Sequence, residues 1–188
     1  MASHLVDLLW FWMGCRKIYH ISGALDTVTD KRRDRSGEPM DVTASAFFSA
    51  AIAMEGKLDV QLSTTWAALG EERFDFSVYG TEGELHFDAT NKLTGAFLSH
   101  RGTVKPISVS GVITEEEENR TTIFKASFVY FAHKIVEAVL TQSCEPVVDA
   151  ATFEDAIPVQ EVLEAIRISA LEGKTVTMNV GYEPGARY

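Results

Sequence analysis

Residues 46–62, Ala-Phe-Phe-Ser-Ala-Ala-Ile-Ala-Met-Glu-Gly-Lys-Leu-Asp-Val-Gln-Leu, carry the pattern that decides the fold. Hydrophobic side chains alternate along residues 46–54, Glu55-Gly56 is a turn signal, and alternation resumes at Leu58. Alternation on both sides of a short turn predicts a β-hairpin. Because strands joined by such short connections pair antiparallel, this stretch predicts an antiparallel sheet.

Similar strand patterns continue on both sides of this hairpin, and short turns again separate them. Between the first two strands, residues 30–39 mix charges with Gly and Pro, which predicts a solvated loop. The middle of the chain, residues 42–109, therefore predicts an antiparallel meander. The expected strands are 17–28, 46–54, 58–62, 74–78, 85–87, 93–100 and 175–179.

Two segments have helical patterns before and after the meander. Residues 4–13 are apolar around nearly the whole helical circumference, and Gly14 is placed to end the helix. Such a helix is expected to be buried on all sides. Residues 123–140 place aromatic and aliphatic side chains on one stripe, which predicts a second helix.

A third helix is expected after Thr152, whose hydroxyl forms a capping-box pattern with Asp155, and Gly173 is expected to end it. A helix, a long antiparallel meander and two further helices indicate an α+β fold. We expect one large, mainly antiparallel sheet with helices packed on one face and the other face open. The expected domain covers residues 1–180, followed by a tail at 181–188.

Charge and composition exclude several classes of partner. With 17 basic and 27 acidic side chains, the formal net charge is 17 − 27 = −10, which argues against nucleic acid and anionic membranes. The apolar run from Leu5 to Met13 is shorter than the roughly 20 residues that span a bilayer. Cys15 and Cys144 show neither metal-ligand spacing nor a disulfide framework, so a reducing, cytoplasmic location is expected.

The sequence contains none of the common local motifs for phosphate binding, metal binding or nucleophilic catalysis. G-x-G-x-x-G, G-x-x-x-x-G-K-[ST], C-x-x-C, H-E-x-x-H and G-x-S-x-G are all absent. No metal site is expected, and any chemistry must come from residues that the fold brings together.

One pair of ionisable residues lies within the apolar first helix. His4 and Asp7 are three residues apart, so they share one helical face. One interpretation is structural: a hydrogen-bonded core histidine, or a carboxylate stabilised by the start of the helix. The other is functional: the pair lines a cleft, where His4 exchanges a proton with a hydroxyl or carbonyl and Asp7 orients it.

The order of these features resembles the C-terminal domain of the glucose-fructose oxidoreductase / inositol dehydrogenase (Gfo/Idh/MocA) family. Ala2 to Asp7, followed by Phe11 to Gly14, resembles the end of the family's D-x-G-x-H-x-x-D and W-x-x-G segment. Gly80 to Leu85 matches its G-T-x-G-x-L turn. The later part resembles the family at residues 131–134, 145–149, 161–166, 169–170, 172–174 and 176.

The resemblance implies a function for the longer family proteins. They join a Rossmann domain, which binds NAD or NADP and carries a catalytic lysine, to an α+β domain that contacts a sugar, polyol or related substrate. His4 matches the family's catalytic histidine, and Asp7 matches its frequent substrate-binding acid. Trp66, near the end of a strand, is a candidate wall of the substrate site. The open sheet face is expected to form a homo-oligomer.

The chain also departs from the family pattern. The first acid of the motif would precede Met1, Ala2 occupies the glycine position, and the Rossmann half is missing. Without a nicotinamide site there is no hydride donor, so this chain alone is expected to be inactive and to bind no cofactor. The alternative is a non-enzymatic oligomerising or ligand-binding module that lost its cofactor domain.

Overall fold

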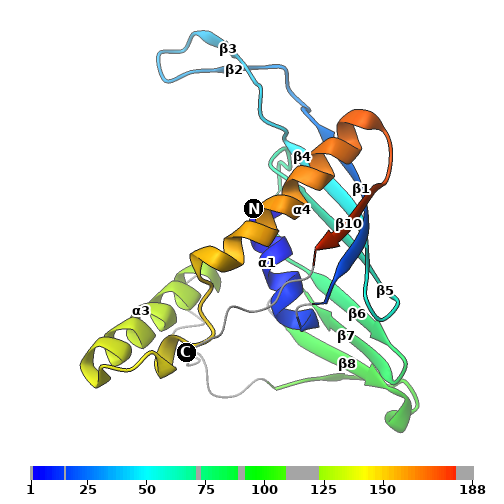
Figure 1. The fold of residues 1–188 in the computed structure, drawn as a ribbon, viewed down its shortest axis with the longest axis vertical. Coiled ribbons are helices and arrows are strands. Elements are labelled where there is room, and N and C mark those ends of the chain that lie inside the picture. The colour runs from blue at the N-terminus through cyan, green and yellow to red at the C-terminus, as the bar shows by residue number, and fades with distance from the viewer. Residues whose placement is uncertain (1, 15, 71–72, 89–91, 109–122, 181–188) are drawn as a thin grey trace. The chain divides into compact units, whose positions relative to one another are not determined.

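The computed structural model describes residues 2–14, 16–70, 73–88, 92–108 and 123–180. The chain divides into two compact units, Met1–Leu69 with Ala150–Tyr188, and Gly70–Asp149. We call them unit 1 and unit 2. Figure 1 shows the elements of both, and each unit is described by itself.

Unit 1 is built on a four-stranded antiparallel sheet with the strand order β10-β1-β4-β5. The hairpin of β4 and β5 pairs Phe47 with Thr65 at one end and Met54 with Leu58 at the other, as the alternation predicted. Its turn places Gly56 and Lys57 in left-handed backbone, with φ of 82° and 60°. The strands are β1 (Ile18–Asp26), β4 (Phe47–Met54), β5 (Leu58–Thr65) and β10 (Val176–Val180).

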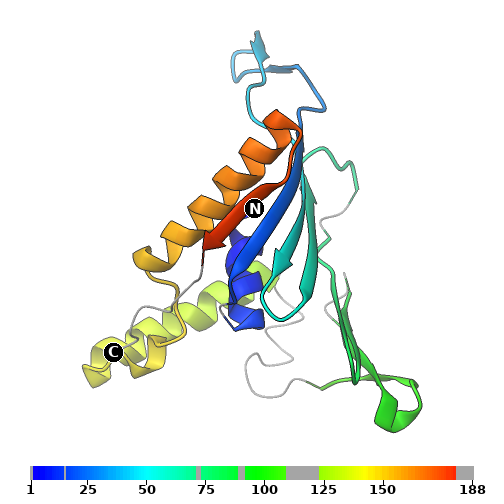
Figure 2. The same cartoon turned by 45° about the vertical axis from the view of Figure 1, so that its right-hand side comes forward.

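Two helices, α1 (Ala2–Met13) and α4 (Phe153–Glu172), share one hydrophobic core with the sheet of unit 1. Figures 1 and 2 show α4 running along the sheet beside β1 and β10. Inward side chains alternate along β4, and every second residue of that strand from Phe48 to Met54 is buried. The helices therefore cover one face of this sheet, as predicted.

The ends of α4 follow the sequence signals. The Thr152 hydroxyl accepts a hydrogen bond from the Asp155 N–H at 3.3 Å, and the Asp155 carboxylate accepts one from the Thr152 N–H at 2.6 Å. Gly173 ends the helix in left-handed backbone with φ of 63°. These reciprocal bonds satisfy donors that a helix start otherwise leaves unpaired.

The helix α4 lies very close to β1 where Ile166 faces Gly23. A Cβ atom on Gly23 would lie 2.7 Å from Cγ2 and 2.8 Å from the carbonyl oxygen of Ile166. The buried Ser169 hydroxyl accepts a hydrogen bond from the Gly23 N–H at 2.9 Å and donates one to the Lys174 carbonyl at 2.6 Å. Only glycine fits at position 23, because the helix backbone occupies the space of a side chain.

Residues 30–39 are exposed as expected, but the prediction that they form only a loop is wrong. Strands β2 (Lys31–Arg33) and β3 (Pro39–Asp41) form a short antiparallel hairpin. The Asp34 carboxylate closes its turn by accepting bonds from the N–H groups of Ser36 and Glu38. The turn is therefore stabilised by hydrogen bonds between an aspartate side chain and the backbone close to it in sequence. The charged composition of this stretch did not indicate such a turn.

Unit 2 contains a second antiparallel sheet with the order β6-β7-β8-β9. Phe74, Phe76 and Phe87 form a ring cluster on it, with centroids 5.3–6.2 Å apart. The elements are β6 (Phe76–Gly80), β7 (Gly83–Phe87), β8 (Leu93–Phe97), η1 (Leu98–His100), β9 (Val104–Pro106), α3 (Ile123–Thr141) and η2 (Glu145–Val147).

The α+β class and the antiparallel pairing are confirmed. In the described residues, however, hydrogen bonding distributes the strands over two four-stranded sheets and the β2–β3 hairpin, and not over one large sheet. The meander prediction was right within each sheet, since short turns determine neighbouring pairs. It did not determine pairing across the longer connection between β5 and β6.

Candidate functional site

The candidate site is built on α1, and two local signals determine where this helix ends. Gly14 takes left-handed backbone with φ of 73°, and its N–H donates to the Trp10 carbonyl at 3.1 Å. Glycine adopts this conformation without the penalty that a Cβ would add. The helix therefore stops at Met13 and turns the chain toward β1.

One side of α1 is buried. Val6 is fully inaccessible, and Leu9 and Trp10 pack in the same core beside α4 and the sheet. The indole N–H of Trp10 donates to the Arg16 carbonyl at 3.1 Å, so its one polar atom is satisfied. This buried stripe determines the rotation of α1 about its axis.

The opposite side of α1 is uncovered, so the prediction of a helix buried all round is wrong. Phe11 is 57% and Trp12 41% exposed, His4 is exposed, and Asp7 and Leu8 are half-buried. The apolar residues surround the whole circumference, but the sheet and α4 contact only the stripe opposite to His4. Contacts with α4 and the sheet determine which side of α1 is buried, and the composition of the helix could not indicate that side.

His4 and Asp7 lie on this uncovered face together with Leu8 and Phe11. Residues three, four and seven apart on a helix with 3.6 residues per turn point to the same side. The exposure of His4 excludes the interpretation of a core histidine. An imidazole, a carboxylate and an aromatic ring are thus presented on one accessible surface, which we call the α1 outer face.

This combination of groups has a definite chemical capacity. An imidazole can give or take a proton near neutral pH, and a carboxylate can accept hydrogen bonds from hydroxyl groups. The neighbouring apolar rings would exclude water once a second surface covers them, and a water-poor site strengthens polar interactions. The α1 outer face therefore suits acid-base work on a polar substrate, provided that another surface completes the site.

Trp66, the third predicted site residue, lies elsewhere on unit 1. It follows β5, its backbone N–H donates to the Ala46 carbonyl at 2.8 Å, and its side chain is 64% exposed. In the part of the chain that the structure describes, no hydrogen bond or ring contact joins it to His4 or Asp7. His4 and Asp7 thus share one face of α1, whereas Trp66 follows a different element, β5.

A groove between α4 and β10 was missed by the sequence reasoning. It is lined by Gln160, Glu161, Glu164, Ala165, Ile168, Val176, Thr177 and Met178. The alternation of Val176 and Met178 indicated an inward strand face, but no local pattern indicated a hollow beside it. The groove depends on how far the helix and the strand stand apart, which is a tertiary property.

The described residues offer no metal site and no membrane span. Among them, no group of three His, Cys, Asp or Glu side chains is placed to hold a metal ion. No helix in these same ranges has the length and hydropathy needed to cross a bilayer. The full sequence has no glycine-rich phosphate loop of the G-x-G-x-x-G type.

Comparison with known proteins identifies the family. The model of the oxidoreductase family's C-terminal alpha/beta domain, that of the Gfo/Idh/MocA proteins, matches residues 1–178. The chain belongs to this family. The match of this Gfo/Idh/MocA domain starts at α1 and ends within β10, so it includes both units and the α1 outer face. No curated protein sequence matches the chain significantly.

Solved structures share the Gfo/Idh/MocA fold at low sequence identity. Levoglucosan dehydrogenase in complex with NADH and L-sorbose is 19% identical with a TM-score of 0.73, covering 94% of this chain and 48% of that one. An oxidoreductase domain protein from Kribbella flavida is 21% identical with a TM-score of 0.76, covering 94% and 48%. A super-repressor mutant of Gal80p from Saccharomyces cerevisiae is 11% identical with a TM-score of 0.66, covering 93% and 47%. The chain spans about half the length of the structures it matches.

Proposed function

We propose that this domain is the substrate-binding and oligomerisation half of an NAD(P)-dependent oxidoreductase that acts on a hydroxyl or carbonyl of a sugar, polyol or related molecule. The observation that carries the proposal is the α1 outer face, where His4 and Asp7 lie among uncovered apolar and aromatic side chains. Membership of the family supports it. So do matching structures of levoglucosan dehydrogenase with NADH bound, one with L-sorbose and one with levoglucosan.

In this proposal the chain's own residues perform the proton-transfer and positioning parts of the reaction. The nicotinamide, bound by residues outside this sequence, supplies or accepts the hydride. His4 takes the proton from the substrate hydroxyl during oxidation and returns it during reduction. Asp7 accepts a hydrogen bond from a neighbouring substrate hydroxyl and so orients the reacting carbon. Trp66 is the proposed wall of the substrate site, supported by its exposed indole.

The proposed surface for a homo-oligomer is the open face of the unit 1 sheet, the side away from α1 and α4. The paired rows Ala24–Ser49–Ser63 and Ser22–Ala51–Gln61 present uncharged side chains across three strands, and all of them except Gln61 are small. Depletion of charge is typical of interface centres, and these two central rows contain no charged side chain, whereas Asp26 and Asp59 lie in the rows on either side. A second copy can bring its own open face close, because small side chains leave the two sheets near contact.

The catalytic proposal is tested in the assembled enzyme, with this domain joined to its NAD(P)-binding partner domain. His4→Ala should lower kcat by about 100-fold, the usual effect of losing an acid-base group, with a smaller change in KM. The exposed histidine His100, on η1, gives the matched control His100→Ala, which should leave kcat unchanged. Near-normal turnover of His4→Ala would remove this imidazole from the mechanism.

The oligomer proposal is tested by light scattering on the purified chain. Ala51→Arg places a charge at the centre of the open face and should convert the oligomer to monomers. Ala156→Arg introduces the same side chain on the exposed surface of α4 and should leave the mass unchanged. An unchanged mass for Ala51→Arg would exclude this face as the interface.

A second function is a non-enzymatic oligomerising or ligand-binding module. The fold match to a Gal80p super-repressor mutant favours it, because that protein carries the same domain fold under a name that describes repression. This alternative predicts that the chain forms a stable oligomer and neither quenches nor shifts NADH fluorescence. In addition, His4→Ala would then leave sugar binding, measured by calorimetry, unaffected.

A further inference from the structure

Arg16 joins the end of α1 to the turn of the β4–β5 hairpin. Its Nε donates to the Met13 carbonyl at 3.1 Å, and its Nη1 donates to the Glu55 carbonyl at 3.3 Å. Met13 is the last residue of α1, and Glu55 directly follows β4. Figures 1 and 2 show this end of α1 beside the start of β1. One guanidinium therefore connects two elements that are distant in sequence, and we call this connection the Arg16 bridge.

The end of α1 is a favourable place for a cation. The last carbonyls of a helix lack partners within it, and the helix dipole makes this end negative. The backbone of Arg16 takes part as well, because its carbonyl accepts a hydrogen bond from the indole N–H of Trp10 at 3.1 Å. Trp10 is buried in the core. Arg16 thus holds the last turn of α1 through its backbone and its side chain.

The hairpin turn leaves room for this guanidinium. Gly56 has a φ of 82°, and a Cβ atom there would collide with Nη1 of Arg16 and lie 3.4 Å from its Cζ. The Glu55 N–H donates to the Lys17 carbonyl at 2.8 Å, which fixes the turn against the residue before β1. Glycine at position 56 therefore serves both the left-handed turn and the Arg16 bridge.

The Arg16 bridge restricts a motion of α1 that the buried stripe of this helix restricts less. Packing of the stripe determines the rotation of α1, but the hydrophobic effect has no direction. Hydrogen bonds do depend on direction, so the bridge opposes sliding of α1 along its axis. His4 lies about 14 Å from Met13 along the same helix, at 1.5 Å per residue. Because a short helix moves as a unit, the bridge also determines where His4 lies.

We propose that Arg16 is a positioning residue, which fixes the place at which α1 presents His4 and Asp7 to the substrate. The proposal rests on the proposed function, because this place affects turnover only if His4 transfers the proton. Arg16 acts through α1 and itself touches neither substrate nor cofactor. Its planar guanidinium offers donors at fixed angles to two carbonyls, whereas a lysine ammonium acts as a single point charge. A displacement of about 1 Å in an active site can cost about 100-fold in rate, so a fraction of an ångström matters.

The role of Arg16 is tested in the assembled enzyme by a double-mutant cycle with His4. Arg16→Ala should lower kcat, measured per folded molecule, by about tenfold, and Arg16→Lys should recover part of this loss. In the His4→Ala background, Arg16→Ala should lower kcat by less than about twofold, because the misplaced group is already absent. A residue that only stabilises the fold would give the same factor in both backgrounds.

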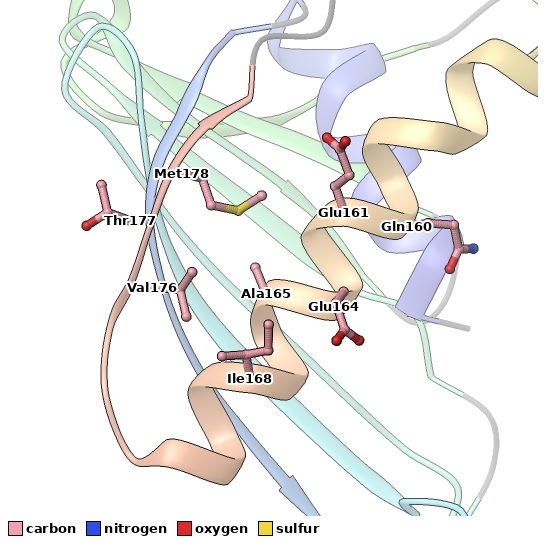
Figure 3. A pocket seen from close by; sticks show the side chains of 8 residues that line it. All are labelled: Gln160, Glu161, Glu164, Ala165, Ile168, Val176, Thr177 and Met178. Carbon is pink, nitrogen blue, oxygen red and sulfur yellow. The ribbon is translucent and has the colours of Figure 1, made fainter.

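Arg167→Ala is the matched control for the loss of a guanidinium. Arg167 is exposed, and it donates two hydrogen bonds to Glu164, of 2.7 and 2.6 Å. Figure 3 shows Glu164 at the groove between α4 and β10, which is lined by residues of these two elements. We expect Arg167→Ala to leave kcat unchanged in both backgrounds.

Hydrogen exchange on the purified 188-residue chain tests the Arg16 bridge without any turnover. The Gly14 N–H, which donates to the Trp10 carbonyl, reports opening of the last turn of α1. Arg16→Ala and Gly56→Ala should each speed its exchange by about tenfold, the second because the new Cβ displaces the guanidinium. Gly37→Ala should leave this exchange unchanged, because Gly37 has a similar φ of 89° but a Cβ there meets no atom within 4 Å.

Each outcome decides a different claim. Unchanged Gly14 exchange in Arg16→Ala and Gly56→Ala would disprove the bridge. Faster exchange with an unchanged kcat, or with the same loss of kcat in both His4 backgrounds, would leave a purely structural bridge and overturn the positioning role. Near-normal kcat of His4→Ala would instead refute the proposed function, and the role of Arg16 toward His4 with it. The exchange data would still show whether the bridge exists.

Discussion

Replacing Gly23 by alanine tests the contact between β1 and α4 directly. The new Cβ would lie 2.7 Å from Cγ2 and 2.8 Å from the carbonyl oxygen of Ile166. The second of these atoms belongs to the helix backbone, so the strand or the helix must move. Overpacking of this kind typically costs about 1–3 kcal/mol.

Part of this cost is offset, because glycine loses more conformational freedom on folding than alanine does. This effect favours the folded state of the alanine variant by about 0.5–1 kcal/mol. We therefore expect a net loss of roughly 1–2 kcal/mol in the free energy of unfolding. For a chain of this size, each kcal/mol lowers Tm by about 2–4 °C.

Tryptophan fluorescence is the appropriate assay. Trp10, Trp12 and Trp66 are the only tryptophans of the sequence, and all three lie in unit 1, so the signal reports the unit that contains this contact. Gly70→Ala is the matched control, because a Cβ there meets no atom within 4 Å. Equal midpoints for Gly23→Ala and Gly70→Ala in urea would refute the close approach of β1 and α4.

Three further predictions concern polar contacts. Ser169→Ala removes the buried hydroxyl between β1 and the end of α4 and should cost about 1–3 kcal/mol of unfolding free energy in urea, because two backbone groups lose their partner; a loss below the measurement error would contradict this bridge. Thr152→Ala removes the hydroxyl cap on the Asp155 N–H and should lower the stability of unit 1 by about 1 kcal/mol, whereas Thr152→Ser should retain most of it. The Ser36 hydroxyl is the main cause that holds the pKa of Asp34 below its usual value, so the turn loses this support as pH falls through the Asp34 pKa. Ser36→Ala should raise that pKa in an NMR titration of the carboxyl carbon, and an unchanged titration would exclude the bond in solution.

Local signals in the sequence predicted those parts of the fold that nearby residues determine. The hairpin of β4 and β5 follows from alternation and a short turn, and the limits of α4 follow from Thr152 and Gly173. The capping groups of α4 are a few residues apart, and the hairpin strands are joined by a short turn, so the local sequence encodes these contacts.

Tertiary packing decided the remaining features. The sequence of α1 is apolar on all sides, and only the positions of α4 and the sheet select Val6, Leu9 and Trp10 as the buried stripe. For the candidate site, the three-residue spacing placed His4 and Asp7 on one face, but it could not show that this face would be uncovered.

The turn of the β4–β5 hairpin contains a residue whose backbone conformation lowers the stability of the protein. Lys57 occupies left-handed backbone, which costs a non-glycine residue roughly 1–2 kcal/mol. The side chain is exposed, and the position lies outside the core. Asparagine or glycine at this corner would relax the backbone without touching the α1 outer face. This single surface substitution is therefore expected to raise the free energy of unfolding of unit 1 while leaving the α1 outer face unchanged.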